Sequence, residues 1–133
     1  YKKPILIKIS PDLSFPQINH ILDLVKEFNI SGIIATNTSS KRDNLISSKS
    51  SIESKGPGGL SGRPIFNKSK KIVEYIYQKS SGNLPIIAVG GIMSADDACE
   101  MLNAGASLVQ IYTGFIYNGP SLLTDIKKKL LSV

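Results

Sequence analysis

A pair of glycines after an apolar run is the part of this chain best suited to bind an anion. Residues 86–89 (Ile-Ile-Ala-Val) predict a buried parallel strand that runs into Gly90 and Gly91. Ser94 is placed to cap the helix that follows, with Asp97 at the capping-box position. Such a turn exposes backbone N–H groups, which favour an anion together with the helix dipole. We expect a Cβ on either glycine to hold a phosphate away from the backbone. The alternative is an ordinary strand-to-helix turn.

Polar side chains mark two other predicted strands. The strand over residues 32–36 ends at Thr36 and is followed by Asn37 and Thr38. Ligands of parallel α/β folds bind at this end of the strands, although a polar turn would have the same composition. Lys8 interrupts the apolar strand over residues 5–9, where a lysine is costly unless it meets an anion or reaches water.

Composition narrows the classes of function. The net charge is +6, with 41% hydrophobic and 20% charged residues, which is typical of a soluble globular protein. The lysines indicate either a solvated surface or a preference for an anionic ligand or membrane surface. No basic run is interleaved with aromatics, so no nucleic-acid partner is predicted. With one cysteine, Cys99, and one histidine, His20, no metal site is predicted. We expect Cys99 to be a small core residue of a helix and His20 to lie on a helix surface.

The elements alternate strand and helix four times. Strands are predicted at residues 5–9, 32–36, 86–89 and 107–111, and the helices begin near Ser14, Pro64, Ala95 and Pro120. Right-handed crossovers then give four adjacent parallel strands. An eight-stranded barrel takes about 250 residues and builds its phosphate site from the last two strand-to-helix loops. The predicted fold is therefore α/β: residues 1–133 form the C-terminal half of a TIM (β/α)8 barrel, as a piece of a longer polypeptide that begins here without Met.

Three packing expectations follow from the apolar pattern. The strand over residues 5–9 reads as buried on both faces. The helix over residues 64–79 should bury Ile72, Val73, Ile76 and Tyr77. The last helix should bury Leu122, Leu123, Ile126 and Leu130, and Gly105 should end the helix over residues 95–103 as its C′ residue.

A serine-rich stretch separates the second strand from the third helical pattern. Residues 39–55 show no periodicity, which is typical of a lid, a binding loop or a mobile excursion. The glycines of residues 56–62 indicate either backbone packed close to another group or a flexible linker, and Leu60 with the helix start at Arg63-Pro64 favours an ordered turn.

Five blocks of this sequence together resemble the dihydroorotate dehydrogenase family. In this order they are Ile7-Lys8-Ile9-Ser10-Pro11-Asp12-Leu13, Ala35-Thr36-Asn37-Thr38, Gly58-Gly59-Leu60-Ser61-Gly62-Arg63-Pro64, Val89-Gly90-Gly91-Ile92 and Ala104-Gly105-Ala106-Ser107-Leu108-Val109-Gln110-Ile111-Tyr112-Thr113-Gly114. The likeness covers nearly the whole chain and is to the C-terminal half of the family's barrel. Arg63-Pro64 and Gln110-Ile111-Tyr112 are more similar to the membrane-associated, quinone-reducing class than to the soluble class.

The resemblance implies oxidation of dihydroorotate to orotate in pyrimidine (UMP) biosynthesis. A base takes a proton from one carbon, a hydride passes from the neighbouring carbon to FMN, and quinone reoxidises the flavin. The implied location is peripheral, on the mitochondrial inner membrane or the bacterial cytoplasmic membrane. Membrane contact would come from an N-terminal region that is not in this sequence.

The same resemblance implies roles for ten residues. Lys8 would lie at the flavin pyrimidine edge and stabilise negative charge on the reduced ring. The cofactor-binding residues would be Lys8, Thr36, Ser61, Gly62, Gly90, Gly91, Tyr112 and Thr113. Asn37 and Thr38 would bind the substrate.

No catalytic residue is predicted in this chain. The base of the quinone-dependent class is a serine from the first half of the barrel, which these residues do not include, and Cys99 is predicted behind a strand rather than at a strand end. Two other interpretations are a non-catalytic half-barrel that binds FMN or another phosphate, and a complete small flavodoxin-like domain.

Overall fold

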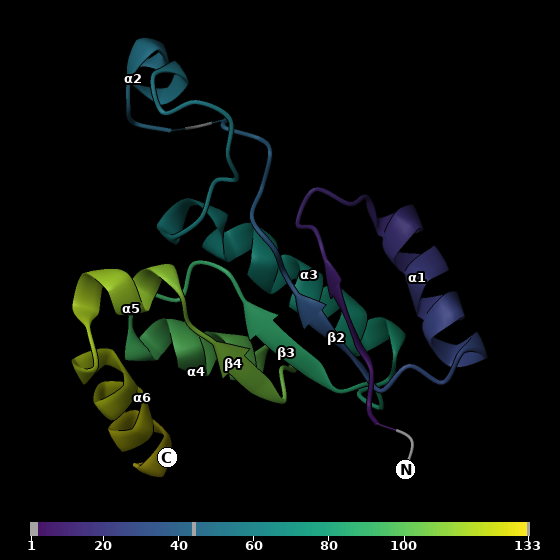
Figure 1. Ribbon diagram of the computed structural model, residues 1–133. Helices are drawn as coiled ribbons and strands as arrows, with labels where there is room; N and C mark the ends of the chain where they lie inside the picture. Colours follow the sequence, from purple (N-terminus) through teal and green to yellow (C-terminus); the bar gives the residue numbers. More distant parts are fainter. Residues whose placement is uncertain (1–2, 44, 133) are drawn as a thin grey trace.

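The computed structural model describes residues 3–43 and 45–132 and contains one parallel sheet with helices packed behind it (Figure 1). Its elements, in chain order, are β1 (Leu6–Ile9), α1 (Phe15–Glu27), β2 (Gly32–Ala35), α2 (Lys49–Glu53), the 3-10 turn η1 (Arg63–Ile65), α3 (Phe66–Lys79), β3 (Ile86–Val89), α4 (Ala95–Asn103), β4 (Leu108–Gln110), α5 (Thr113–Asn118) and α6 (Ser121–Leu131).

The sheet has the predicted topology. Its strand order is β1-β2-β3-β4 and all three pairings are parallel. Ile9 pairs with Ala35, Ala35 with Ala88, and Ala88 with Val109, so the four strands end at nearly the same level. Because parallel strands place their carboxyl ends at one edge, the four following loops meet there.

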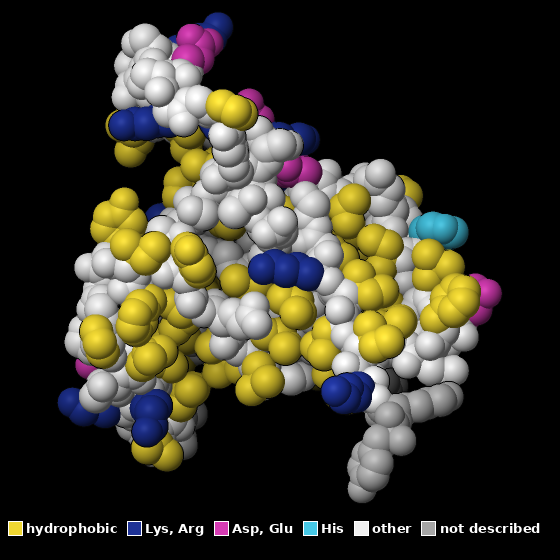
Figure 2. Space-filling view, viewed as in Figure 1, with side chains coloured by type: hydrophobic (Ala, Val, Ile, Leu, Met, Phe, Trp, Pro, Cys, Tyr) yellow, Lys and Arg dark blue, Asp and Glu magenta, His cyan; other side chains and the backbone are white. Residues whose placement is uncertain are grey.

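In the part of the chain that the structure describes, helices cover one face of the sheet and leave the other open. Figure 1 shows the strands in front of α3 and α4, and the residues that point toward those helices, such as Ile33, Ile86 and Ala88, are fully buried. The opposite face is largely hydrophobic in Figure 2 but is accessible to solvent: Leu6 is 37% exposed and Leu108 is 61% exposed. The expectation that residues 5–9 are buried on both faces is therefore wrong, because no described element covers that side of β1.

Local signals at the helix ends are confirmed. The Ser14 N–H donates to Gln17 Oε1 at 2.9 Å, which gives α1 the predicted capping box. Gly105 follows the end of α4 with a φ of +105°, as a C′ glycine should. As predicted, His20 is exposed on α1. Cys99 lies on α4 but is half-buried rather than a core residue, so that expectation is corrected.

Three of the predicted core positions are wrong. Tyr77 is 44% exposed because its ring lies across Gly82 and Gly105 on the surface, while Ile72, Val73 and Ile76 are buried. On α6, Leu123 and Leu130 are 45% and 42% exposed. The apolar stripe of this helix is wider than the surface that the described residues offer it, since only Leu122 and Ile126 face the core.

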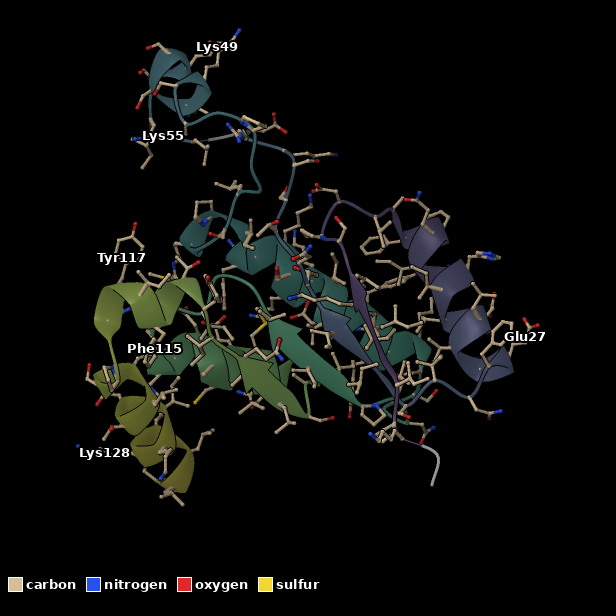
Figure 3. All side chains as sticks on the ribbon, in the orientation of Figure 1. Glu27, Lys49, Lys55, Phe115, Tyr117 and Lys128 are labelled. Atoms are coloured by element: carbon tan, nitrogen blue, oxygen red, sulfur yellow. The ribbon has the colours of Figure 1, made fainter. Side chains whose placement is uncertain are left out.

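The serine-rich stretch forms an excursion, residues 40–59, that projects from the sheet and carries α2 (Figure 3, where Lys49 and Lys55 mark it). Its base is closed by an antiparallel bridge between Ser39 and Leu60, whose backbones exchange hydrogen bonds of 3.0 and 2.7 Å. Arg42 donates to the carbonyls of Ile52, Gly56 and Gly58 at 2.8–3.2 Å and so orders the interior. No helix in residues 3–43 and 45–132 is long and apolar enough to cross a bilayer.

Candidate functional site

A cavity of about 530 Å³ opens at the carboxyl ends of the strands. All ten site residues predicted from the sequence line it: Lys8, Thr36, Asn37, Thr38, Ser61, Gly62, Gly90, Gly91, Tyr112 and Thr113. They come from β1, from the segments that follow β2, β3 and β4, and from the turn that precedes η1. The level strand ends explain why residues more than 100 positions apart share one cavity.

The two glycines of the β3 turn are required by packing against α3. A Cβ on Gly91 would lie 2.6 Å from the backbone N and Cα of Phe66, and one on Gly90 would lie 2.5 Å from Ser69 Oγ. Both residues also have positive φ, of +77° and +127°. The expectation that a Cβ here would act by displacing a phosphate is thus corrected: it would first collide with α3.

Four residues that line the cavity have backbone N–H groups without a partner among the described residues. The N–H groups of Gly91, Ile92, Thr113 and Gly114 donate to no acceptor within residues 3–43 and 45–132. Two of them belong to the β3 turn and two to the first turn of α5, and the two turns line the same cavity. N–H groups that lack intramolecular acceptors at the edge of a cavity are suited to bind an anion.

Two hydroxyl groups connect the turn before η1 to the start of α5 at the edge of the cavity. Thr113 Oγ1 donates to Ser61 Oγ at 3.1 Å, and a Cβ on Gly62 would lie 3.1 Å from Thr113 Cγ2. The predicted close packing of the glycine run is also seen at Gly59, where a Cβ would collide with Thr38. The end of the run, Ser61 and Gly62, is therefore an ordered wall of the cavity.

The polar residues after β2 differ in whether their side chains are hydrogen-bonded within the fold. Thr36 is 1% exposed, and its Oγ1 lies 2.8 Å from Ser69 Oγ, so its hydroxyl is used within the fold. Asn37 is fixed through its backbone, with its N–H donating to the Ile9 carbonyl at 2.8 Å, while its side chain is exposed at the cavity. Lys8 lines the cavity floor and takes part in no ion pair formed by the described residues.

Asp97 joins two walls of the cavity from outside. Its carboxylate, 3% exposed, accepts hydrogen bonds from the Met93 N–H at 2.8 Å and from Arg63. Ser94 caps α4 as predicted, accepting from the Asp97 N–H at 3.2 Å, but the carboxylate itself contacts Met93 rather than closing the predicted box. Burial alone would raise the pKa of Asp97; the hydrogen bonds from Arg63, Met93 and Ser94 outweigh burial and lower it.

Sequence reasoning missed two contributors to this region. Helix α5 was not predicted, because its six residues, Thr113–Asn118, are too short for a periodic apolar pattern. Asp12 was quoted only as part of a block, yet it connects three segments of the chain. A carboxylate directly after a strand and a proline was the available signal for Asp12.

Four parallel β/α units with a cavity at the carboxyl ends of the strands define part of a TIM-barrel protein. Over residues 1–133 the chain matches the family model described as dihydroorotate dehydrogenase. It is 51% identical to a quinone-dependent dihydroorotate dehydrogenase of Synechocystis sp., covering 98% of this chain and 35% of the relative. A Christiangramia forsetii protein of the same name is also 51% identical, over 97% of this chain and 37% of the relative.

A solved structure agrees. Ligand-free dihydroorotate dehydrogenase from Eimeria tenella superimposes with a TM-score of 0.89 at 39% identity, over 98% of this chain and 36% of that one. The chain therefore belongs to the dihydroorotate dehydrogenase family, and the predicted TIM-barrel fold class is confirmed. It spans about a third of the length of the relatives it matches.

The Asp97 contacts predict a pH-dependent stability. Because its folded-state pKa is lowered, Asp97 stabilises the fold fully above its unfolded pKa of about 3.9, and this contribution is lost as the pH falls through the folded value. We expect Asp97→Asn to lower the free energy of unfolding by about 2 kcal/mol at pH 7. Urea titrations measure this free energy of unfolding, and the difference between Asp97→Asn and the unchanged protein should become smaller below about pH 4.

Asp125→Asn is the matched control, since Asp125 is exposed on α6 and forms no ion pair within the described chain. If the loss of unfolding free energy in Asp97→Asn did not depend on pH, the lowered pKa of Asp97 would be contradicted.

Proposed function

We propose that these residues form the C-terminal half of the barrel of a quinone-dependent dihydroorotate dehydrogenase, which oxidises dihydroorotate to orotate in pyrimidine biosynthesis. The observation that carries the proposal is the single cavity that gathers the ten predicted site residues and the unpartnered backbone N–H groups. The 51% identity to relatives named dihydroorotate dehydrogenase (quinone) supports the same activity.

The residues of the cavity fit FMN. Its phosphate would be held by the free N–H groups of Gly91, Thr113 and their following residues, and Tyr112 lies between the β4 end and this turn. Ser61 and Gly62 would line the flavin and ribityl chain, with Gly90 and Thr36 beside them through backbone atoms. When bound, FMN supplies the hydride acceptor of the oxidation and passes the electrons to quinone. Lys8 would place a fixed positive charge at the ring edge.

Asn37 and Thr38 would orient the substrate. The Asn37 amide makes no hydrogen bond with the described residues, so its donor and its acceptor are both available to a ligand. None of the residues that line the cavity is Asp, Glu, His or Cys. Cys99 lies on α4 and not at the cavity, and the Ser61 hydroxyl is already in contact with Thr113. The proton-abstracting base would therefore come from the other half of the barrel.

The proposed partners follow from this assignment. They are dihydroorotate or orotate, quinone, and the N-terminal half of the barrel, with membrane contact through the N-terminal region and a peripheral location on the mitochondrial inner or bacterial cytoplasmic membrane. The absence of Asp, Glu, His and Cys among the lining residues of the described chain favours one second candidate, a half-barrel that binds FMN or phosphate without catalysis.

Replacing Lys8 tests the electrostatic role. In the full-length enzyme, Lys8→Met keeps the length of the side chain but removes its charge, so we expect a lower flavin reduction potential and slower hydride transfer. Both are measured by redox titration and by stopped-flow reduction with dihydroorotate. Lys71→Met, an exposed lysine on α3 away from the cavity, should change neither quantity. A normal rate and potential in Lys8→Met would assign the lysine a structural role only.

Replacing Asn37 tests the substrate role. Asn37→Ala should retain FMN but lower kcat/KM for dihydroorotate by about 10- to 100-fold, since a substrate hydrogen-bonding group loses its partner. Asn103→Ala, on the exposed face of α4, is the control and should leave kcat/KM unchanged. An unchanged kcat/KM in Asn37→Ala would remove this residue from the substrate site.

The division of the site predicts that residues 1–133 alone do not oxidise dihydroorotate. The expressed segment, supplied with FMN and a quinone acceptor, should form no orotate above background, because general-base catalysis contributes about 10²–10⁴-fold. Activity should appear on mixing with a separately made N-terminal half. Turnover by the segment alone, comparable to that of a complete enzyme, would place a base within these residues.

A further inference from the structure

A carboxylate outside the cavity connects the loops that carry its polar residues. Asp12 lies just beyond β1 and is not one of the residues that line the cavity. Its Oδ1 accepts from Ser39 Oγ at 2.6 Å and from Lys68 Nζ at 2.5 Å. Its Oδ2 accepts from the Ser40 N–H at 2.7 Å and from Ser40 Oγ at 2.8 Å. One side chain therefore joins the loop after β1, the segment after β2 and helix α3.

These contacts require two acceptor oxygens. An asparagine in place of Asp12 would turn an NH₂ group either toward the Lys68 ammonium or toward the Ser40 N–H, and both are donors that cannot act as acceptors. Either amide orientation leaves one side of the cluster with donors facing donors. Burial alone would raise the pKa of Asp12, but the hydrogen bonds from Lys68, Ser39 and Ser40 outweigh it and hold the pKa well below its usual range. The carboxylate is thus charged at neutral pH.

The cluster holds the segment that directly follows Asn37 and Thr38. Ser39 is 3% exposed and is bonded both to Asp12 and, through its backbone, to Leu60. Leu60 immediately precedes Ser61, which lines the cavity, so one anchor acts on two of its walls. At its other end the segment is fixed where the Asn37 N–H donates to the Ile9 carbonyl at 2.8 Å.

We infer that Asp12 is a positioning residue for substrate: by holding Ser39 and Ser40 it sets where Asn37 and Thr38 present their side chains to dihydroorotate. This rests on the proposed function. Within the described residues, the turns after β3 and β4, which form the phosphate end of the cavity, donate no hydrogen bond to the Asp12 carboxylate. Loss of the Asp12 carboxylate should therefore affect the substrate more than the cofactor.

The test is Asp12→Asn in the full-length holoenzyme. We expect KM for dihydroorotate to rise about tenfold, the size typical of a lost charged hydrogen bond, with kcat changed by less than about threefold and FMN bound in the same stoichiometry as before. Hydrogen exchange of the peptide that spans residues 37–40 should become faster. Glu100→Gln is the matched control: it breaks the 2.8 Å ion pair that joins α3 to α4 through Lys70, away from the cavity, and should leave KM unchanged.

The outcomes separate this inference from the proposed function. If the unchanged enzyme does not oxidise dihydroorotate, the proposed function fails, and the exchange measurement still reports whether Asp12 orders residues 37–40. If the unchanged enzyme is active but Asp12→Asn keeps its KM, the positioning role is overturned. An equal rise in KM in Glu100→Gln, or loss of FMN in Asp12→Asn, would also overturn it, because either would indicate general destabilisation.

Discussion

The close approach of helix α3 to the turn after β3 is the constraint on which this edge of the molecule depends. Phe66 lies where any side chain on Gly91 would be, and Ser69 lies equally close to Gly90. With the helix seated there, Ser69 reaches the Thr36 hydroxyl, and Arg63, just before the helix, reaches Asp97. The position of one helix start thus sets the loops after β2 and β3 relative to each other.

Carboxylates and backbone N–H groups occupy different positions around the cavity. The carboxylates of Asp12 and Asp97 lie behind its walls, where neighbouring loops satisfy them and lower their pKa. The described residues that line the cavity supply backbone N–H groups and the Lys8 ammonium, and none of them carries a carboxylate. The local field therefore favours an anion although acidic side chains are nearby.

The sequence predicted the elements whose signals are local and repeated, and missed features that depend on contacts between distant segments. Alternating apolar strands and helices identified the sheet order, and the family blocks identified ten of the sixteen residues that line the cavity. Leu123 and Leu130 were assigned to the core because an apolar stripe does not reveal how much surface it meets. The packing of Gly91 against Phe66 was missed because the two residues lie 25 positions apart and no local pattern connects them. The four donors on Asp12 likewise come from residues far along the chain.

The bridge between Ser39 and Leu60 makes the excursion mechanically independent of the site. Its internal contacts, made by Arg42 to nearby carbonyls, lie beyond the bridge, while the residues that line the main cavity lie on the other side of it. Lengthening a loop whose ends are already joined costs only chain entropy, about 0.6 kcal/mol for each doubling. Apart from Ser40, which is bonded to Asp12, and Gly59, which packs against Thr38, positions of the excursion can therefore change in length and composition without moving the walls of the cavity. These positions are suited to carry an appended peptide or a label.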